Sequence, residues 1–179
     1  MGYEDLTPEE IWLEYHTDSV VMPEELARIQ RGYAEASAEA VRELPCHLDV
    51  AYGSEGHRQT LDIFPAAARG APLLVFFHGG YWKIGSKEGR RFQAKAFVPR
   101  GIAYCTANYR LAPEFTIEDA IADCRASIVW AYSHAEEYGC DRERIYVCGN
   151  SAGGHLVGAV LADDWLDAVG LPSDVVKGG

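Results

Sequence analysis

Residues 144–155 read Arg-Ile-Tyr-Val-Cys-Gly-Asn-Ser-Ala-Gly-Gly-His, a short β-rich run followed by a Gly-x-Ser-x-Gly turn and then by small residues. This order predicts a buried strand, an abrupt turn at Ser151 and a helix that begins at Ala152. Such a turn exposes a serine hydroxyl at the top of a sheet, and Gly149 and Gly153 avoid collisions with the neighbouring backbone. The amide of Ala152 then lies at a helix N-terminus, where the helix dipole favours a developing negative charge. Ser151 is therefore the candidate nucleophile, and Ala152 offers a candidate oxyanion donor.

A second motif lies upstream, where residues 72–82 read Pro-Leu-Leu-Val-Phe-Phe-His-Gly-Gly-Tyr-Trp. The continuous apolar run is typical of a buried parallel strand, and the glycines allow the following amides to face a ligand. The amides of Gly80 and Tyr81 are the remaining candidate oxyanion donors. A single Gly-x-Ser-x-Gly motif is weak, because an ordinary strand–loop–helix joint reads the same way. The two motifs together favour an α/β-hydrolase.

Three segments, His78–Trp82, Asn108–Glu114 and Gly149–His155, together resemble the kynurenine formamidase (arylformamidase) branch of the α/β-hydrolases, which adjoins the hormone-sensitive-lipase-like esterases. The resemblance covers nearly the whole chain from about Pro45 onward. The Tyr-Trp pair after His-Gly-Gly matches the formamidase branch. The departure is at Asn150, where these formamidases usually carry His and the lipase-like esterases usually carry Asp.

The resemblance implies a serine hydrolase that cleaves an aryl formamide similar to N-formylkynurenine, or a small ester, through an acyl-serine intermediate. It implies neither a metal nor an organic cofactor, and a small acyl or formyl compound as the partner. In the family, His78 orients the loop that carries the oxyanion donors. His78, Gly79, Trp82 and Asn150 are the further motif and pocket residues. Tyr81 and Trp82 are candidates to line an aromatic pocket, and a packing role for Trp82 is the alternative.

Two other functions remain open at this stage. A short-chain carboxylesterase would suit the Tyr-Arg-Leu-Ala-Pro-Glu segment at 109–114 and the Asn at 150 equally well. A non-catalytic remnant or binding module would keep the pocket and the turn but lack the rest of a catalytic triad.

Composition excludes several classes of protein. The 179 residues are 48% apolar and 24% charged, which indicates one globular domain or part of one. The net charge of −11 argues against nucleic acid or an anionic membrane as partner, because both repel an acidic surface. No apolar run approaches the roughly 18 residues that a bilayer crossing needs. Five cysteines without C-x-x-C spacing suggest neither a disulfide framework nor a zinc site, and favour the reducing cytoplasm.

The N-terminal residues 1–44 are expected to form a helical leader that packs on the domain. Thr7-Pro8-Glu9-Glu10 is a capping box, and a longer helix is predicted from Pro23 until Pro45 stops it. In the family, segments before the first strand help to cover the active site, so Trp12 or Tyr15 are candidates to touch substrate. The alternative is that these aromatic side chains anchor the helix to the core.

Residues 45–179 are expected to form the N-terminal part of a single α/β-hydrolase domain. Alternating apolar residues predict an antiparallel hairpin at the sheet edge, with strands around 48–52 and 61–63. Buried strands then follow at 72–77, 102–107 and 145–148, with helices expected over 86–98 and from a Thr116 cap to Gly139, and a polar loop at 141–144. Strands alternating with helices predict a mostly parallel, doubly wound sheet.

The sequence supplies no obvious base for Ser151. In this fold the triad follows the chain order Ser, then Asp or Glu, then His, but the only histidine after Ser151 is His155. His155 lies four positions along the same helix and is expected to be a packed or capping residue. Asp163, Asp164 and Asp167 are expected on a solvated face, and His16, His47, His57 and His134 at the surface. We therefore expect an incomplete α/β-hydrolase fold that lacks the C-terminal third, with the 145–148 strand as an open edge prone to self-association.

Overall fold

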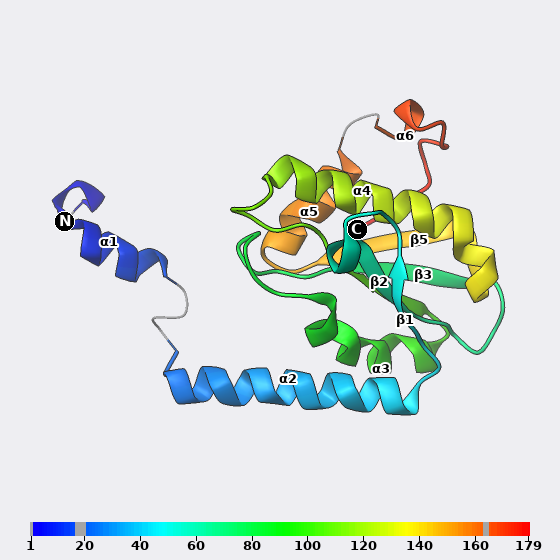
Figure 1. Ribbon diagram of the computed structural model, residues 1–179, viewed down its shortest axis with the longest axis horizontal. Coiled ribbons are helices and arrows are strands. Elements are labelled where there is room, and N and C mark those ends of the chain that lie inside the picture. The colour runs from blue at the N-terminus through cyan, green and yellow to red at the C-terminus, as the bar shows by residue number, and fades with distance from the viewer. Residues whose placement is uncertain (1, 17–20, 163–164) are drawn as a thin grey trace.

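The computed structural model describes residues 2–16, 21–162 and 165–179 (Figure 1). The strands are β1 (His47–Ala51), β2 (Thr60–Phe64), β3 (Ala71–Phe77), β4 (Ala103–Ala107) and β5 (Cys140–Gly149). The α-helices are α1 (Pro8–Tyr15), α2 (Pro23–Glu43), α3 (Ala94–Phe97), α4 (Ile117–His134), α5 (Ala152–Leu161) and α6 (Trp165–Ala168). Short 3-10 helices are η1 (Tyr3–Asp5), η3 (Gly56–Gln59), η4 (Lys87–Gln93), η5 (Val98–Arg100) and η6 (Ala135–Tyr138).

The five strands form one mixed sheet in the order β1-β2-β4-β3-β5. β1 pairs with β2, and β2 with β4, in antiparallel fashion, whereas β3 pairs in parallel with both β4 and β5. This arrangement confirms the predicted fold class and the hairpin at the sheet edge. The register places Phe77 opposite Gly149, so β3 and β5 end side by side. The two motifs that follow these strands are therefore neighbours.

Helices cover both faces of the sheet, with α4 and α5 on one side and α2 and α3 on the other (Figure 1). The larger core cluster combines apolar side chains of the strands with those of α4 and α5, including Ile128 and Leu156. A smaller cluster on the opposite face includes Phe64 and Tyr104. Burial of these apolar surfaces is the main favourable contribution to folding.

The two helices of the leader differ in how they contact the rest of the chain. α2 packs along η4, where the ring of Tyr33 stacks on Phe92 at 5.0 Å and the Phe92 amide donates to Ser37 Oγ at 3.2 Å. The predicted capping box of α1 is present at Thr7. α1 nevertheless buries none of its residues and lies apart from the sheet and its covering helices (Figure 1).

Two expected elements have different boundaries in the structure. The single helix expected over 86–98 is instead η4, α3 and η5, since side-chain and backbone contacts hold the segment from Lys87 onward in a tighter coil. The polar residues 141–144, expected to form a loop, belong to β5, which begins at Cys140. Cys140 is paired opposite Ala71, and polar side chains are tolerated there because several of them face solvent.

The outer edge of β5 is not fully open, contrary to the expectation from sequence. Val176 forms a parallel bridge with Ile145, the Lys177 amide donates to Ile145 O at 2.8 Å, and the Val147 amide donates to Gly178 O at 3.0 Å. The segment 176–178 thus satisfies part of the β5 edge. Within the described part of the chain, no helix combines the length and apolar character needed to cross a bilayer.

Candidate active site

Ser151 occupies a strained turn between β5 and α5. Its backbone φ is 53° and ψ is −122°, a conformation that residues with a side chain rarely adopt, and the residue is exposed. Hydrogen bonds from Gly153 N to Asn150 O (2.9 Å) and from Gly154 N to Ser151 O (2.8 Å) hold the turn. The serine side chain therefore stands at the end of the sheet rather than within the core.

The glycines on either side of this turn are required by close backbone approach. A Cβ atom at Gly153 would lie 2.8 Å from His78 O, and one at Gly149 would collide with the Gly153 carbonyl. The first turn of α5 can therefore approach the end of β3 closely. The Ala152 amide is in this first turn, where N–H groups have no partner within the helix.

The loop after β3, residues 79–86, lies directly against the turn, and we call it the oxyanion loop. A Cβ atom at Gly79 would lie 3.1 Å from Ser151 Cβ, and the Gly79 amide donates to Asn150 Oδ1 at 3.2 Å. Three successive residues, Gly80, Tyr81 and Trp82, have positive φ angles of 131°, 51° and 56°. The structure thus brings Gly79, Asn150 and Ser151 together, with Gly80 and Tyr81 on the same tight loop.

His78 holds the start of the oxyanion loop. Its ring is fully buried, stacks on Tyr109 at 4.3 Å, and its Nδ1 lies 2.8 Å from Gly79 O. The Tyr109 hydroxyl donates to His78 O at 2.7 Å. Burial lowers the pKa of His78 to about 4, so the ring is neutral at pH 7. A neutral Nδ1–H that donates to Gly79 O fixes the direction of this peptide group.

Trp82 and His155 form a contact across the site that the sequence did not reveal. The indole Nε1 donates to His155 Nδ1 at 3.3 Å, and the two rings meet edge to face at 5.3 Å. His155 is exposed rather than packed in the core, and its acceptor Nδ1 requires the proton on Nε2. The contact links the oxyanion loop to the helix that follows the nucleophile.

An aromatic groove lies between α1 and the oxyanion loop. Its volume is about 580 Å³, and it is lined by Ile11, Trp12, Tyr15, His16, Tyr81, Trp82, Lys83 and Ile84. Trp12 and Tyr15 are 57% and 78% exposed, so they do not anchor α1 to the core. Trp82 lines the groove and also packs on the edge of the main core. The two alternatives expected for this residue, lining an aromatic pocket and packing, therefore occur together.

The described residues supply no partner for the Ser151 hydroxyl comparable to a catalytic base. Among the contacts described for residues 2–16, 21–162 and 165–179, no histidine hydrogen-bonds to it, and His16, His47, His57 and His134 are exposed or half-buried. Asp167 is an exposed residue of α6. Asp163 and Asp164 lie outside the described residues.

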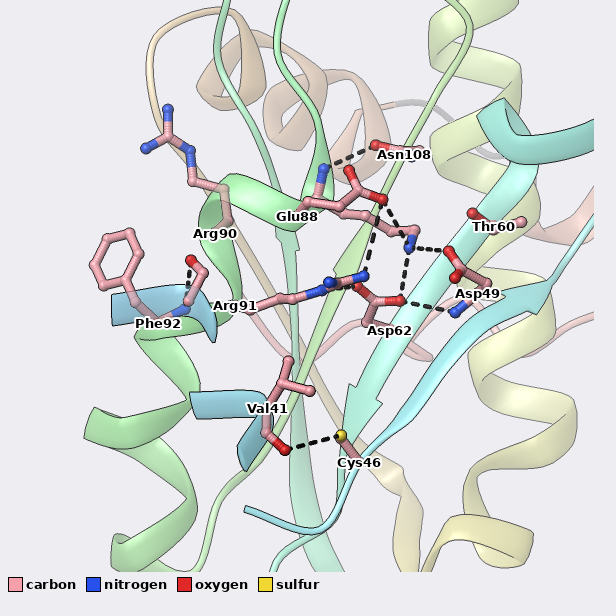
Figure 2. Close-up of polar contacts among 12 residues, drawn as sticks. Val41, Cys46, Asp49, Thr60, Asp62, Glu88, Arg90, Arg91, Phe92 and Asn108 are labelled. Atoms are coloured by element: carbon pink, nitrogen blue, oxygen red, sulfur yellow. Dashed lines mark hydrogen bonds and ion pairs between the residues drawn. The ribbon is translucent and has the colours of Figure 1, made fainter. Parts of the chain in front are cut away.

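A buried ionic cluster next to the oxyanion loop also escaped the sequence analysis. Lys87 and Asp62 are fully buried and hydrogen-bond to each other, and Asp49, Glu88 and Arg91 surround them (Figure 2). These residues come from β1, β2 and η4. No sequence signal indicated this cluster, because Asp49 and Asp62 lie in the alternating hairpin strands and the other three in the segment expected to form a helix over 86–98.

Comparison with known proteins places the fold and the motifs in context. The BD-FAE family model matches residues 61–164, more than half of the chain. Kynurenine formamidase of Salmo salar is 34% identical over 66% of this chain and 39% of that protein. Carboxylic ester hydrolase LipN of Mycobacterium tuberculosis is 34% identical over 82% of this chain and 41% of that protein. The crystal structure of a putative thioesterase from Silicibacter superposes with a TM-score of 0.75 at 28% identity, over 90% of this chain and 57% of that one. The chain thus spans about two fifths of the length of these two curated relatives.

Proposed function

This chain belongs to the BD-FAE family of α/β-hydrolases, and from that premise we propose that it is the nucleophile-bearing part of a serine hydrolase. The observation that carries the proposal is the strained, exposed Ser151 packed against Gly79 of the oxyanion loop. Strain of this kind persists at functional sites because the surrounding structure holds it. The division into a leader (1–44) and a hydrolase domain (45–179) is part of the same proposal.

In the proposed reaction, Ser151 Oγ attacks the carbonyl carbon of a small ester or formamide. The amides of Gly80, Tyr81 and Ala152 stabilise the negative charge on the carbonyl oxygen, and each such donor typically contributes on the order of 3 kcal/mol. The alcohol or amine leaves with a proton, and water then releases the acyl group from the serine. The base and its carboxylate partner would come from outside these 179 residues.

An aryl formamide is the substrate class that the aromatic groove supports best. Exposed Trp12, Tyr15 and Tyr81 offer ring faces beside the oxyanion loop, and an aryl group gains by stacking on such faces. The relatives named kynurenine formamidase support the same substrate class. A short-chain carboxylesterase is the second candidate; the LipN and LipM relatives favour it, and Asn150, whose side-chain Oδ1 accepts from the Gly79 amide, suits it equally well.

A fluorophosphonate probe followed by peptide mapping tests the nucleophile. Because the proposed base lies outside these 179 residues, we expect slow modification, but at Ser151 in preference to all other serines of the chain, and loss of labelling in Ser151→Ala. Ser133→Ala removes an exposed hydroxyl on α4 and is the matched control. Labelling spread evenly over several serines, or absent from Ser151, would favour a non-catalytic binding module instead.

Two further measurements separate the candidate functions. The coding sequence after Gly179 should continue in frame to an aspartate or glutamate and then a histidine, and a stop codon there would support the remnant. Hydrolysis of N-formylkynurenine compared with p-nitrophenyl acetate by the resulting protein distinguishes a formamidase from a carboxylesterase. A preference for the acetate ester would reject the formamide assignment and keep Ser151 as the nucleophile.

A further inference from the structure

The oxyanion loop closes on itself, so its two ends determine each other's position. Gly80 O accepts hydrogen bonds from the amides of Lys83 and Ile84, both at 2.9 Å. At the far end, a Cβ atom on Gly85 would lie 2.6 Å from Gly79 O and 2.8 Å from His78 Nδ1. Gly79, which faces Ser151, therefore packs closely against Gly85.

Lys87 fixes the chain two residues after Gly85. Its side chain is fully buried, and its ammonium group donates to Asp49 Oδ1 and Asp62 Oδ1, both at 2.6 Å, and lies 3.1 Å from Glu88 Oε1. Its backbone amide donates to Asn108 Oδ1 at 2.8 Å. Lys87 is thus attached to β1, β2 and the end of β4 at once.

The carboxylate at the centre of this cluster is itself rigidly held. Asp62 is fully buried in β2 and accepts from the Asp49 amide at 2.8 Å and from Arg91 Nε at 2.6 Å, in addition to Lys87 (Figure 2). Buried ion pairs contribute little net stability compared with apolar side chains of similar size. What they do provide is a single, well-defined position for the groups they join, because each charge must keep its partner.

We propose that Lys87 is a positioning residue for the oxyanion loop. Its ammonium group, locked between Asp62 and Asp49, sets the place of Gly85 and thereby the direction of the Gly79–Tyr81 amides relative to Ser151. This inference rests on the proposed function for its catalytic consequence. The inference that Lys87 orders the loop does not depend on the proposed function.

The chain offers a matched pair of variants for the test. Lys87→Met and Arg91→Met each remove one cation from the same Asp62 carboxylate, but Lys87 directly follows the oxyanion loop, whereas Arg91 lies four residues further along η4. We expect Lys87→Met to lower the maximal rate of Ser151 modification by a fluorophosphonate on the order of tenfold or more. The apparent binding constant of the probe should stay within about twofold of the wild-type value. Arg91→Met should keep the wild-type rate even where its thermal stability falls. Lys87→Arg should recover part of the rate.

Hydrogen exchange measured by mass spectrometry on residues 79–86 supplies a readout that needs no reaction. We expect faster exchange in Lys87→Met than in Arg91→Met. Equal labelling rates and equal exchange in the two variants would overturn the inference. Failure of the wild-type chain to label at Ser151 would count against the proposed function alone, since the exchange comparison would still decide the role of Lys87. If Lys87→Met does not melt cooperatively, Asp49→Asn replaces it. This substitution removes the negative charge of one partner of the ammonium group, and we expect a smaller effect in the same direction.

Discussion

At the scale of single residues, His78 couples the core of the protein to the proposed catalytic loop. Its ring is buried against Tyr109, and its Nδ1 fixes the Gly79 carbonyl. A protonated imidazole in this position would be a buried charge without a carboxylate partner among its described contacts. The neutral form is therefore the one that the folded protein requires.

This requirement predicts a specific loss of stability in acid. Burial lowers the pKa of His78 from 6.5 to about 4, so the unfolded chain takes up a proton before the folded one as the pH falls. The stability contributed by neutral His78 is complete above pH 6.5 and is lost as the pH falls toward 4. The whole change amounts to about 3 kcal/mol in the free energy of unfolding.

Urea unfolding between pH 7.5 and 4 measures this effect. His78→Asn keeps a side-chain donor for Gly79 O but no longer titrates, so we expect its free energy of unfolding to fall less steeply over this interval. Tyr109→Phe is the control, because it removes the hydrogen bond to His78 O and leaves the imidazole in place. A pH dependence of His78→Asn identical to that of the wild type would reject the buried neutral histidine.

Residue-level patterns predicted the strained turn at Ser151 better than the contacts that surround it. Ser151 and its flanking glycines form a contiguous motif whose backbone geometry follows from local sterics, and the structure shows the expected strained turn. Lys87 and Asp62 are 25 residues apart and meet only because β2 lies beside η4 in the folded sheet. No local periodicity encodes such a pair. The Trp82–His155 contact was not predicted for the same reason, because the two residues are 73 positions apart in the sequence.

At the scale of elements, the same capping box occurs at two helices with different surroundings. Thr116 Oγ1 accepts from the Asp119 amide at 3.1 Å, and Thr7 Oγ1 accepts from the Glu10 amide at 3.2 Å. α4 buries six residues against the sheet, including Asp123 and Ile128, whereas α1 buries none. The two helices carry the same kind of capping sequence, but α4 packs against the sheet and α1 does not.

We therefore expect matched cap substitutions to differ in their effect. Thr116→Ala should lower the free energy of global unfolding by about 1 kcal/mol, because the first turn of a core helix loses its cap. Thr7→Ala should leave global unfolding nearly unchanged, since α1 can open locally while the sheet remains folded. Urea unfolding followed by circular dichroism measures both. An equal loss for the two variants would mean that α1 unfolds together with the domain.

Element boundaries were predicted well where a local signal ended the element. Gly139, with a φ of 73°, terminates the α4–η6 segment as expected, and the hairpin, β3 and β4 lie where periodicity placed them. The start of β5 was missed, because residues 141–144 carry polar side chains and lie at a register shift between two points where β5 pairs with β3, Cys140 with Ala71 and Ile145 with Leu73. Tertiary pairing outweighs composition in such a strand.

At the scale of the whole molecule, the edge of β5 is flanked by apolar side chains. A groove of about 490 Å³ runs along this edge, lined by Pro72, Leu74, Phe97, Ile102, Arg144, Tyr146, Val147, Gly178 and Gly179. Tyr146 is 40% exposed there, and the segment 176–178 covers the β5 backbone only in part. A partly paired edge with an apolar flank is a template for association with another chain.

We propose that the 179-residue chain self-associates through this edge. The expected result in sedimentation velocity is a weight-average mass that rises with concentration, despite the net charge of −11, and rises further with salt as repulsion between copies is screened. Tyr146→Lys places a charge on the apolar flank and should shift the distribution toward monomer. Met22→Lys adds the same charge at an exposed position on the leader, at the start of α2, and should leave the distribution unchanged apart from the small effect of net charge. A wild-type chain that stays monomeric at every concentration would show that segment 176–178 is sufficient to protect the β5 edge.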